Sequence, residues 1–226
     1  MLDGETVLGV SSETDLEGHA AERIFEAIAE ALAMAGLSST ALEAFACDIG
    51  PGSFTGVRVG VSAGKGMALG RAAPLVGVGS LEAMAAAAFA TGAARATDIV
   101  VAALDAKKQE VFAAGFDQAG ALVWSPRHIP VASASSLILA GPGSSLAEGS
   151  SLVVVGEVFA LDLGLADKLR RAPALDLPDA ATIGLIAARR LRQMPLADFD
   201  PALVEPLYVR PPDAKPMAET RNPSLS

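Results

Sequence analysis

The sequence has one cysteine, two histidines and no long apolar run. The single thiol, Cys47, cannot form a disulfide within the chain, and with no histidine near it in sequence it reads as a buried structural side chain rather than a nucleophile. A run of about 18 strongly apolar residues, which a membrane span needs, is missing. So is a basic start followed by an apolar core. The sequence therefore predicts a cytoplasmic protein without a membrane partner.

Basic residues are also few. Lys and Arg number 17 against 26 Asp and Glu, which gives a formal net charge of −9. Because phosphate binding depends on Lys and Arg, we predict that the chain does not hold a nucleic acid by itself. With 51% hydrophobic and 19% charged residues, the 226 residues are enough for one large folded domain or two small lobes.

The two histidines, His19 and His128, lie far apart, and neither has the HxxxH spacing that puts two metal ligands on one helical face. Neither lies near a strained serine turn of the GxSxG kind, so no Ser–His–Asp site can be assigned. We therefore predict no metal site and no catalytic residue.

The strongest pattern present is the stretch GPGSFTGVRVGVSAGKGMALG, residues 50–70. The apolar run before it, residues 42–49, predicts a short strand. Its GPG start predicts a turn, because glycine reaches backbone angles that other residues avoid and proline fixes its own. Ser53 or Thr55 can then accept a backbone N–H and begin a helix.

This predicted helix carries small residues in a stripe. Four-residue spacing relates Gly52, Gly56, Gly60, Gly64 and Ala68. Each helical glycine costs about 1 kcal/mol relative to alanine, so the stripe needs a reason. Two interpretations stay open: tight packing inside one domain, or a helix–helix interface between subunits.

Phosphate-binding loops fit this stretch poorly. The segment GVSAGKG, residues 60–66, is one residue short of a Walker loop and lacks the hydroxyl that would hold magnesium. The spacing of Gly50, Gly52 and Gly56 also fails the dinucleotide fingerprint. A nonstandard anion site at the helix start stays open.

Further segments accompany this motif in the order of a known family. They are Gly18, His19, Glu22 and Arg23, then PLVGVGSLEAMA (74–85), VAALDAKKQEVFAA (101–114) and EPLYVRPPDAK (205–215). Together with GPGSFTGVRVG they resemble the TsaB (YeaZ-like) family. That family is the dimerisation subunit of the bacterial machinery that makes threonylcarbamoyladenosine in tRNA.

The resemblance implies a non-catalytic assembly subunit that binds and activates a TsaD-like catalytic subunit. That subunit transfers a threonylcarbamoyl group to an adenosine next to the anticodon, and a TsaE-like ATPase completes the assembly. The chain is expected to form a homodimer when alone and to reach tRNA only through the complex. It is expected to have no cofactor of its own, while the complex uses ATP.

The resemblance also implies which residues meet the partner. They are Gly52, Ser53, Phe54, Thr55, Gly56, Arg58, Gly60 and Gly64 of the glycine-rich helix and its start, with His19 and Arg23 of the helix before it.

Strands that alternate with helices, twice over, predict an α/β protein with two lobes. The resemblance implies the two-lobe actin/hexokinase-type (ASKHA) fold. We assign residues 1–96 to an N-terminal lobe, 97–210 to a C-terminal lobe and 211–226 to a disordered, proline-rich tail. The family begins with two strands, of which only the end of the second matches here. The N-terminal lobe is thus expected to lack its first strands, roughly 15–20 residues.

The element pattern is as follows. Strands are predicted at 4–12, 42–49, 74–78, 98–105, 110–116, 121–124, 152–156 and 205–209. Helices are predicted at 19–35, from 56 onward, and at 81–90, 133–140, 158–169 and 180–193, with Ser80 and Asp179 as caps of two of them. Residues 141–151 are predicted to form a flexible loop.

Two other classes of function compete with the assembly subunit. A small ATP-dependent kinase of the same fold class could use the charged cluster Asp105, Lys107, Lys108 and Glu110 to orient phosphate or metal. It would need an N-terminal phosphate loop that is missing here, and an ordinary polar hairpin turn is favoured for this cluster. A peptidase would need a nucleophile, a base or a metal, and none can be assigned.

A second basic group, Arg189, Arg190 and Arg192, ends the last predicted helix. Solvated side chains that match the helix dipole are favoured there over a nucleic-acid patch.

The tail generates a first prediction. Its four prolines and few apolar residues cannot build a packed element. A chain that ends at Pro211 should therefore keep its melting temperature within a few degrees in a thermal melt. A fall of more than about 5 °C would show that the tail is docked on the folded protein.

Overall fold

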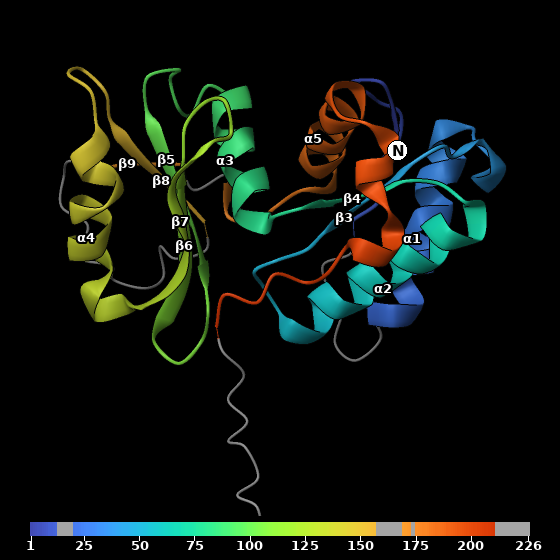
Figure 1. Cartoon of the computed structure of the whole chain (residues 1–226), viewed down its shortest axis with the longest axis horizontal. Coiled ribbons are helices and arrows are strands. Elements are labelled where there is room, and N and C mark those ends of the chain that lie inside the picture. The colour runs from blue at the N-terminus through green and yellow to red at the C-terminus, as the bar shows by residue number, and fades with distance from the viewer. Residues whose placement is uncertain (13–19, 157–168, 173–174, 211–226) are drawn as a thin grey trace, which may run out of the picture.

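The structure is a computed structural model that describes residues 1–12, 20–156, 169–172 and 175–210. Figure 1 shows two halves side by side, each built around its own sheet. The predicted α/β class is confirmed. No helix in these four described ranges is long and apolar enough to cross a membrane.

The half on the left of Figure 1 is built on a five-stranded sheet in the order β7-β6-β5-β8-β9. Its strands are β5 (Ile99–Asp105), β6 (Glu110–Phe116), β7 (Leu122–Pro130), β8 (Leu152–Val155) and β9 (Leu169–Arg171). The first three form an antiparallel meander, and β8 and β9 continue the sheet in parallel with β5. The three strands of the meander were predicted, although β7 runs six residues past the expected end at 124.

Helices cover both faces of this sheet. Figure 1 shows α4 (Val131–Ala140) on one side of it and α3 (Ser80–Ala90) on the other. Alternate residues of β5 therefore enter different cores: Val101 packs with Ile138 of α4, while Val100 packs with Met84 of α3. Because both faces are covered, β5 is apolar almost throughout, as its sequence suggested.

The second half is built on a smaller, two-stranded parallel sheet. It comprises β3 (Phe45–Asp48), β4 (Leu75–Val78), α1 (Ala20–Ala35), α2 (Phe54–Arg71) and α5 (Ala180–Gln193). The chain runs from β3 through α2 to β4, and α2 packs on β3 while α1 packs on α2. α5 packs on both strands.

Two helices pack against strands that lie on the other side of the predicted lobe boundary in the sequence. α3 precedes the predicted boundary at 96/97, yet Leu81 and Met84 pack with Val100 of the larger sheet. α5 follows that boundary, yet Ile183 and Ala187 pack in one cluster with strand β4. The division into lobes 1–96 and 97–210 stays a prediction. The packing of α3 and α5 does not follow that division of the sequence.

An ion pair joins these two helices. Nη2 of Arg190 on α5 donates to Oε1 of Glu82 on α3 at 2.6 Å, and Nη1 donates to the carbonyl of Gly77 at 2.9 Å. The prediction of a solvated side chain is therefore wrong for Arg190. Arg192 pairs with Glu5 at the surface at 2.5 Å, and Arg189 is exposed.

Three predicted elements differ from the structure. The strand at 4–12 is wrong, because β1 (Leu2–Asp3) and β2 (Thr6–Val7) form only a two-residue hairpin around a turn at Gly4. The strand at 205–209 is wrong, because this segment crosses the end of β3 with one backbone bond, from Leu207 N to Ile49 O at 2.7 Å. The loop at 141–151 contains a 3-10 turn, Pro142–Ser145.

Other expectations meet the structure only in part. Ser80 is the first residue of α3 and not its cap, a place taken by Gly79, whereas Asp179 caps α5 as predicted. The helix at 158–169 lies outside the described residues up to 168, and Leu169 begins β9. The tail 211–226 also lies outside them. Short 3-10 turns complete the chain at Ser39–Ala41, Leu196–Phe199 and Pro201–Leu203.

The close packing behind β8 generates a second prediction. Gly156 has φ +124°, and an added Cβ would overlap the carbonyl oxygen of Ala103. Gly156→Ala should therefore lower the free energy of unfolding by more than about 3 kcal/mol in a denaturant titration. The matched control is Gly149→Ala, also at positive φ (+80°) but with nothing within 4 Å. It should cost only about 1–2 kcal/mol, and equal losses for the two would contradict the steric account.

Candidate functional site

The site begins at a hydrogen-bonded turn after β3. The Asp48 carboxylate accepts from the backbone N–H of Gly50 at 2.7 Å, and the Ser80 hydroxyl donates to its two oxygens at 2.7 and 2.9 Å. The N–H of Ser80 in turn donates to the carbonyl of Gly50 at 2.9 Å. Gly50 has φ +94°, a conformation that favours glycine. One carboxylate therefore ties the turn before α2 to the first residue of α3.

Burial shapes the protonation of this turn. It raises the pKa of Asp48 above 3.8, against the hydrogen bonds from Ser80 and Gly50, which lower it. Burial and the neighbouring Asp48 charge raise the pKa of Cys47 to about 11, while Lys65 lowers it less. The Cys47 thiol is 8% exposed and stays protonated at neutral pH. The prediction of a buried cysteine is confirmed.

α2 begins as the sequence suggested. The Ser53 hydroxyl accepts from the N–H of Gly56 at 3.3 Å, so Ser53 and not Thr55 is the cap. The helix starts at Phe54, two residues earlier than predicted. Six residues predicted to meet the partner are all exposed: Gly52, Ser53, Phe54, Thr55, Gly56 and Arg58.

The predicted glycine stripe faces two environments. A Cβ on Gly64 would lie 3.2 Å from Leu75 and 3.4 Å from Cys47, so Gly64 packs against the protein's own sheet. Ala68 is fully buried there as well. A Cβ on Gly60 would meet nothing within 4 Å, and one on Gly56 would meet only Ser53. Packing inside the domain therefore explains Gly64, and it does not explain Gly60.

A second small-residue line on α2 is more exposed than the first. Ser62, Gly66 and Gly70 fall four apart and are all exposed, and Cβ atoms on the two glycines would meet nothing within 4 Å. We call these three residues the small-residue face. The sequence contained this spacing too. It could not be chosen over the first stripe until Val61 and Ala68 were known to face the sheet.

Exposed apolar side chains occur on both α2 and α1. Leu69 beside the small-residue face is 60% exposed, and Phe25 and Met34 of the adjacent helix α1 are 54% and 65% exposed. Arg23 is half-buried on α1, and His19 lies outside the described residues. Both helices therefore carry exposed apolar or small residues in the described part of the chain.

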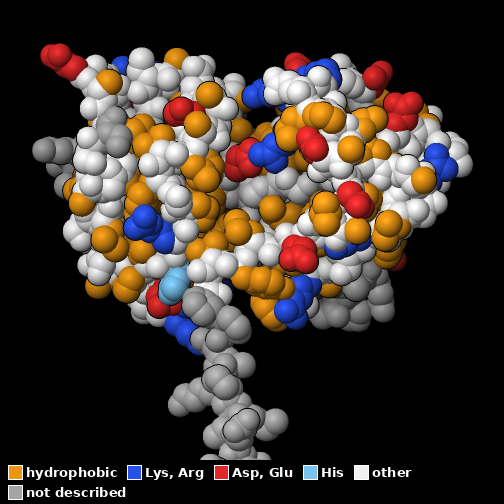
Figure 2. Space-filling view, viewed as in Figure 1, with side chains coloured by type: hydrophobic (Ala, Val, Ile, Leu, Met, Phe, Trp, Pro, Cys, Tyr) orange, Lys and Arg blue, Asp and Glu red, His pale blue; other side chains and the backbone are white. Residues whose placement is uncertain are grey.

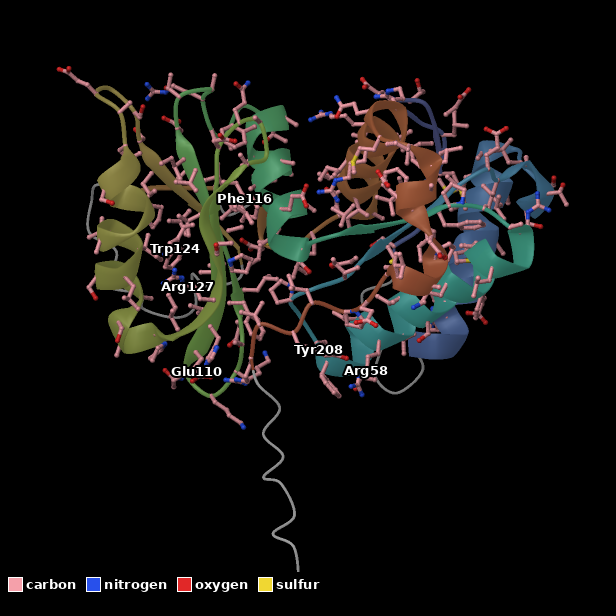
Figure 3. All side chains as sticks on the ribbon, in the orientation of Figure 1. Arg58, Glu110, Phe116, Trp124, Arg127 and Tyr208 are labelled. Atoms are coloured by element: carbon pink, nitrogen blue, oxygen red, sulfur yellow. The ribbon has the colours of Figure 1, made fainter. Side chains whose placement is uncertain are left out.

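An arginine–aromatic cluster stands at the start of α2. Arg58 stacks on Phe54, with its guanidinium carbon 3.7 Å from the ring centroid, and its Nε donates to the Tyr208 hydroxyl at 2.8 Å. The Phe54 and Tyr208 rings lie 5.8 Å apart, and they are 58% and 52% exposed. Figure 3 shows Arg58 and Tyr208 side by side. Figure 2 shows basic side chains beside an apolar patch at this lower edge of the molecule.

Tyr208 comes from the C-terminal strap, which we define as residues 204–210. Lys65 of α2 donates to the carbonyl of Val204 at 2.9 Å, where the strap begins. At its end, His128 Nδ1 lies 3.3 Å from the carbonyl of Val209, and Arg210 binds both the carbonyl of Ala106 and the Glu110 carboxylate. The strap thus joins α2 to the turn between β5 and β6. This segment was predicted to be a strand, and Tyr208 was not among the predicted site residues.

The charged cluster at that turn is paired within the chain. Lys107 donates to Asp105 from its backbone N–H at 2.7 Å and from Nζ at 2.8 Å, and this side-chain bond lowers the pKa of Asp105. Arg210 pairs with Glu110, and Lys107 and Lys108 have positive φ. The interpretation as a polar hairpin turn is confirmed. In the part of the chain that the structure describes, no three His, Cys, Asp or Glu side chains gather as a metal site would require.

Comparison with known proteins agrees with this geometry. The structure of a protein from Pseudomonas aeruginosa, described as similar to peptidase YEAZ, superposes with a TM-score of 0.65 over 84% of each chain. Its 22% identity shows the fold alone. The chain is 39% identical to the tRNA threonylcarbamoyladenosine biosynthesis protein TsaB of Escherichia coli, over 46% of this chain and 43% of that protein. It is 33% identical to an uncharacterized protein of Mycobacterium bovis, over 94% and 84%.

These findings define an α/β protein with the fold of the Pseudomonas structure. A family model described as TsaD, tRNA N6-adenosine threonylcarbamoyltransferase, matches residues 15–217. The chain belongs to this family, and its resemblance to TsaB and YeaZ is confirmed. It spans less than half the length of the Escherichia coli and Haemophilus influenzae TsaB proteins that it matches.

The turn generates a third prediction. Because the folded-state pKa of Asp48 lies above 3.8, the folded protein binds more protons than the unfolded chain just above that pH. The contribution of Asp48 to stability therefore falls as the pH rises through its folded-state pKa. Asp48→Asn keeps the shape without titrating. In urea titrations from about pH 4 to about pH 7, the unfolding free energy of the wild type minus that of the variant should fall.

Ser80→Ala sharpens this test. It removes a hydrogen bond that lowers the pKa of Asp48, so this pKa should rise further. The unfolding free energy of Ser80→Ala minus that of the double variant Ser80→Ala/Asp48→Asn should therefore fall more steeply with pH than the wild-type difference does. A difference that rises with pH would contradict burial as the dominant cause.

Proposed function

We propose that the chain is a non-catalytic assembly subunit that binds and activates a TsaD-like catalytic subunit for threonylcarbamoyladenosine formation in tRNA. The observation that carries the proposal is the exposed small-residue face of α2, with the exposed Leu69 beside it. A face without side chains lets another backbone approach closely, and the helical glycines that it needs cost about 1 kcal/mol each. Gly66 and Gly70 have no packing role in the described protein that would offset that cost.

The residues that we propose to contact the partner are chosen with the packing of α2 in view. It keeps Gly52, Ser53, Phe54, Thr55, Gly56, Arg58, Gly60, His19 and Arg23 from the sequence reasoning, omits Gly64 and adds Ser62, Gly66 and Gly70. Gly64 is omitted because its neighbours are Leu75 and Cys47 of its own core.

The arrangement of charged side chains supports a non-catalytic role over the kinase alternative. In a kinase, the carboxylates Asp105 and Glu110 would have to be open to phosphate or metal, whereas here Lys107 and Arg210 engage them. The peptidase named in a structural neighbour's description has as little support, since the Cys47 thiol is buried and protonated. We therefore propose that the chain needs no cofactor of its own, while the complex uses ATP.

Finer expectations belong to the same proposal. The two halves correspond to the lobes of an actin/hexokinase-type fold. A TsaE-like ATPase joins the complex, tRNA is contacted only through it, and the chain forms homodimers when the catalytic subunit is absent. The net charge of −9 supports the indirect contact with tRNA. The assembly is cytoplasmic.

The small-residue face generates a fourth prediction. Gly66→Leu adds bulk where nothing lies within 4 Å, so the monomer should fold and even gain helix stability, by about 0.8 kcal/mol. The same bulk should weaken binding of the TsaD-like subunit of the same organism at least roughly tenfold, through loss of close approach. Gly60→Leu should behave alike. Size-exclusion chromatography with the partner, alongside a thermal melt, measures both effects.

Two variants serve as controls. Ala132→Leu adds the same kind of bulk at an exposed position of α4, in the other half, and should leave both the complex and the melt unchanged. Gly64→Leu should overpack the core and cost roughly 1–3 kcal/mol or more. A wild-type-like complex with Gly66→Leu would contradict the proposed interface.

A further inference from the structure

The exposed line of α2 does not end at the small-residue face. Arg58 lies four residues, about one helical turn, before Ser62 and is offset from it by only about 40° around the axis, and Phe54 lies one further turn toward the N-terminus. A partner that packs at the Ser62 end of the small-residue face is therefore one helical turn away from Arg58. The arginine–aromatic cluster is continuous with the proposed interface.

Arg58 is held before any partner arrives. Its guanidinium lies 3.7 Å from the Phe54 ring centroid and 5.6 Å from that of Tyr208, and its Nε donates to the Tyr208 hydroxyl at 2.8 Å. These contacts fix the plane of the guanidinium and reduce the side-chain entropy that binding would otherwise cost. The strap supplies Tyr208, and Lys65 holds the start of the strap to α2 at the carbonyl of Val204.

The outer edge of this guanidinium is open. Among the residues that the structure describes, neither Nη1 nor Nη2 of Arg58 donates to an acceptor, and the side chain is exposed. The two Nη groups of an arginine present a planar fork that matches a carboxylate bidentately. The Phe54 and Tyr208 rings next to the guanidinium offer apolar surface, which would remove water from an ion pair formed there and strengthen it.

We infer that Arg58 is the charged anchor of this interface and binds an Asp or Glu carboxylate of the partner protein. Tyr208 is a positioning residue that orients the guanidinium. This inference rests on the proposed function and names the chemistry that the catalytic subunit must present. A protein carboxylate is favoured over an RNA phosphate because the chain carries a net charge of −9 and phosphate binding needs several basic side chains.

The test measures the Kd of the TsaD-like subunit of the same organism for variants of the full chain. Arg58→Met keeps the apolar stem and should raise the Kd at least roughly tenfold, and Arg58→Lys, which keeps the charge but loses the fork, nearly as much. Tyr208→Phe keeps the ring and removes the acceptor of the Nε bond, so it should raise the Kd about threefold. Melting temperatures should stay unchanged.

The chain offers a matched control. Arg127 stacks on Trp124 at 5.0 Å and is likewise exposed, but it lies on β7 in the other half (Figure 3). Arg127→Met should leave the Kd unchanged. The Kd of the wild type should rise with salt more steeply than that of Arg58→Met, since only the wild type can form the ion pair between Arg58 and a carboxylate of the partner.

The outcomes separate the two claims. If Arg58→Met binds like the wild type while Gly66→Leu does not bind, the anchor is wrong and the proposed interface stands. If the wild type does not bind the partner at all, both are wrong. If the isolated chain binds total tRNA in a gel-shift assay and Arg58→Met abolishes that binding, the ligand is a phosphate and the inference is overturned.

Discussion

The Asp48 carboxylate is the interaction on which the arrangement of this protein depends. It accepts the N–H of Gly50 and the hydroxyl of Ser80, and so fixes the turn from which α2 leaves the smaller sheet. Ser80 is also the first residue of α3, the helix that packs on the larger sheet. One partly buried carboxylate thus fixes both the turn from which α2 begins and the first residue of α3. Burial at that position disfavours the charged carboxylate, which is why the pKa of Asp48 is raised.

α2 has two sides with different tasks. Val61, Gly64 and Ala68 pack on β3 and β4, where small residues let the helix lie close to the sheet. The other side is left bare at Ser62, Gly66 and Gly70, and the arginine–aromatic cluster stands at the N-terminal end of the helix. The strap closes the arrangement, because it runs from α2 to the β5–β6 turn and brings Tyr208 to Arg58 on the way. A surface from one half is therefore completed by a segment anchored on the other.

Much of this could be predicted from the sequence. The strands of the meander and β8 were predicted from the sequence, and the caps Ser53 and Asp179 marked the helices that they begin. What failed depended on distant contacts. Residues 205–209 look like a strand, yet the end of β3 offers them one backbone bond at Ile49. Likewise, the choice between two four-residue stripes on α2 needed the position of the sheet, which spacing alone does not contain.

The central claim is that α2 and the strap meet a catalytic partner, and amide hydrogen exchange on the intact chain tests it most directly. On addition of the TsaD-like subunit, exchange should slow in peptides that cover α2 and residues 204–210. Peptides of the five-stranded sheet and α4 should exchange as before. Slowed exchange confined to the β5–β6 turn, or none in α2, would contradict the account.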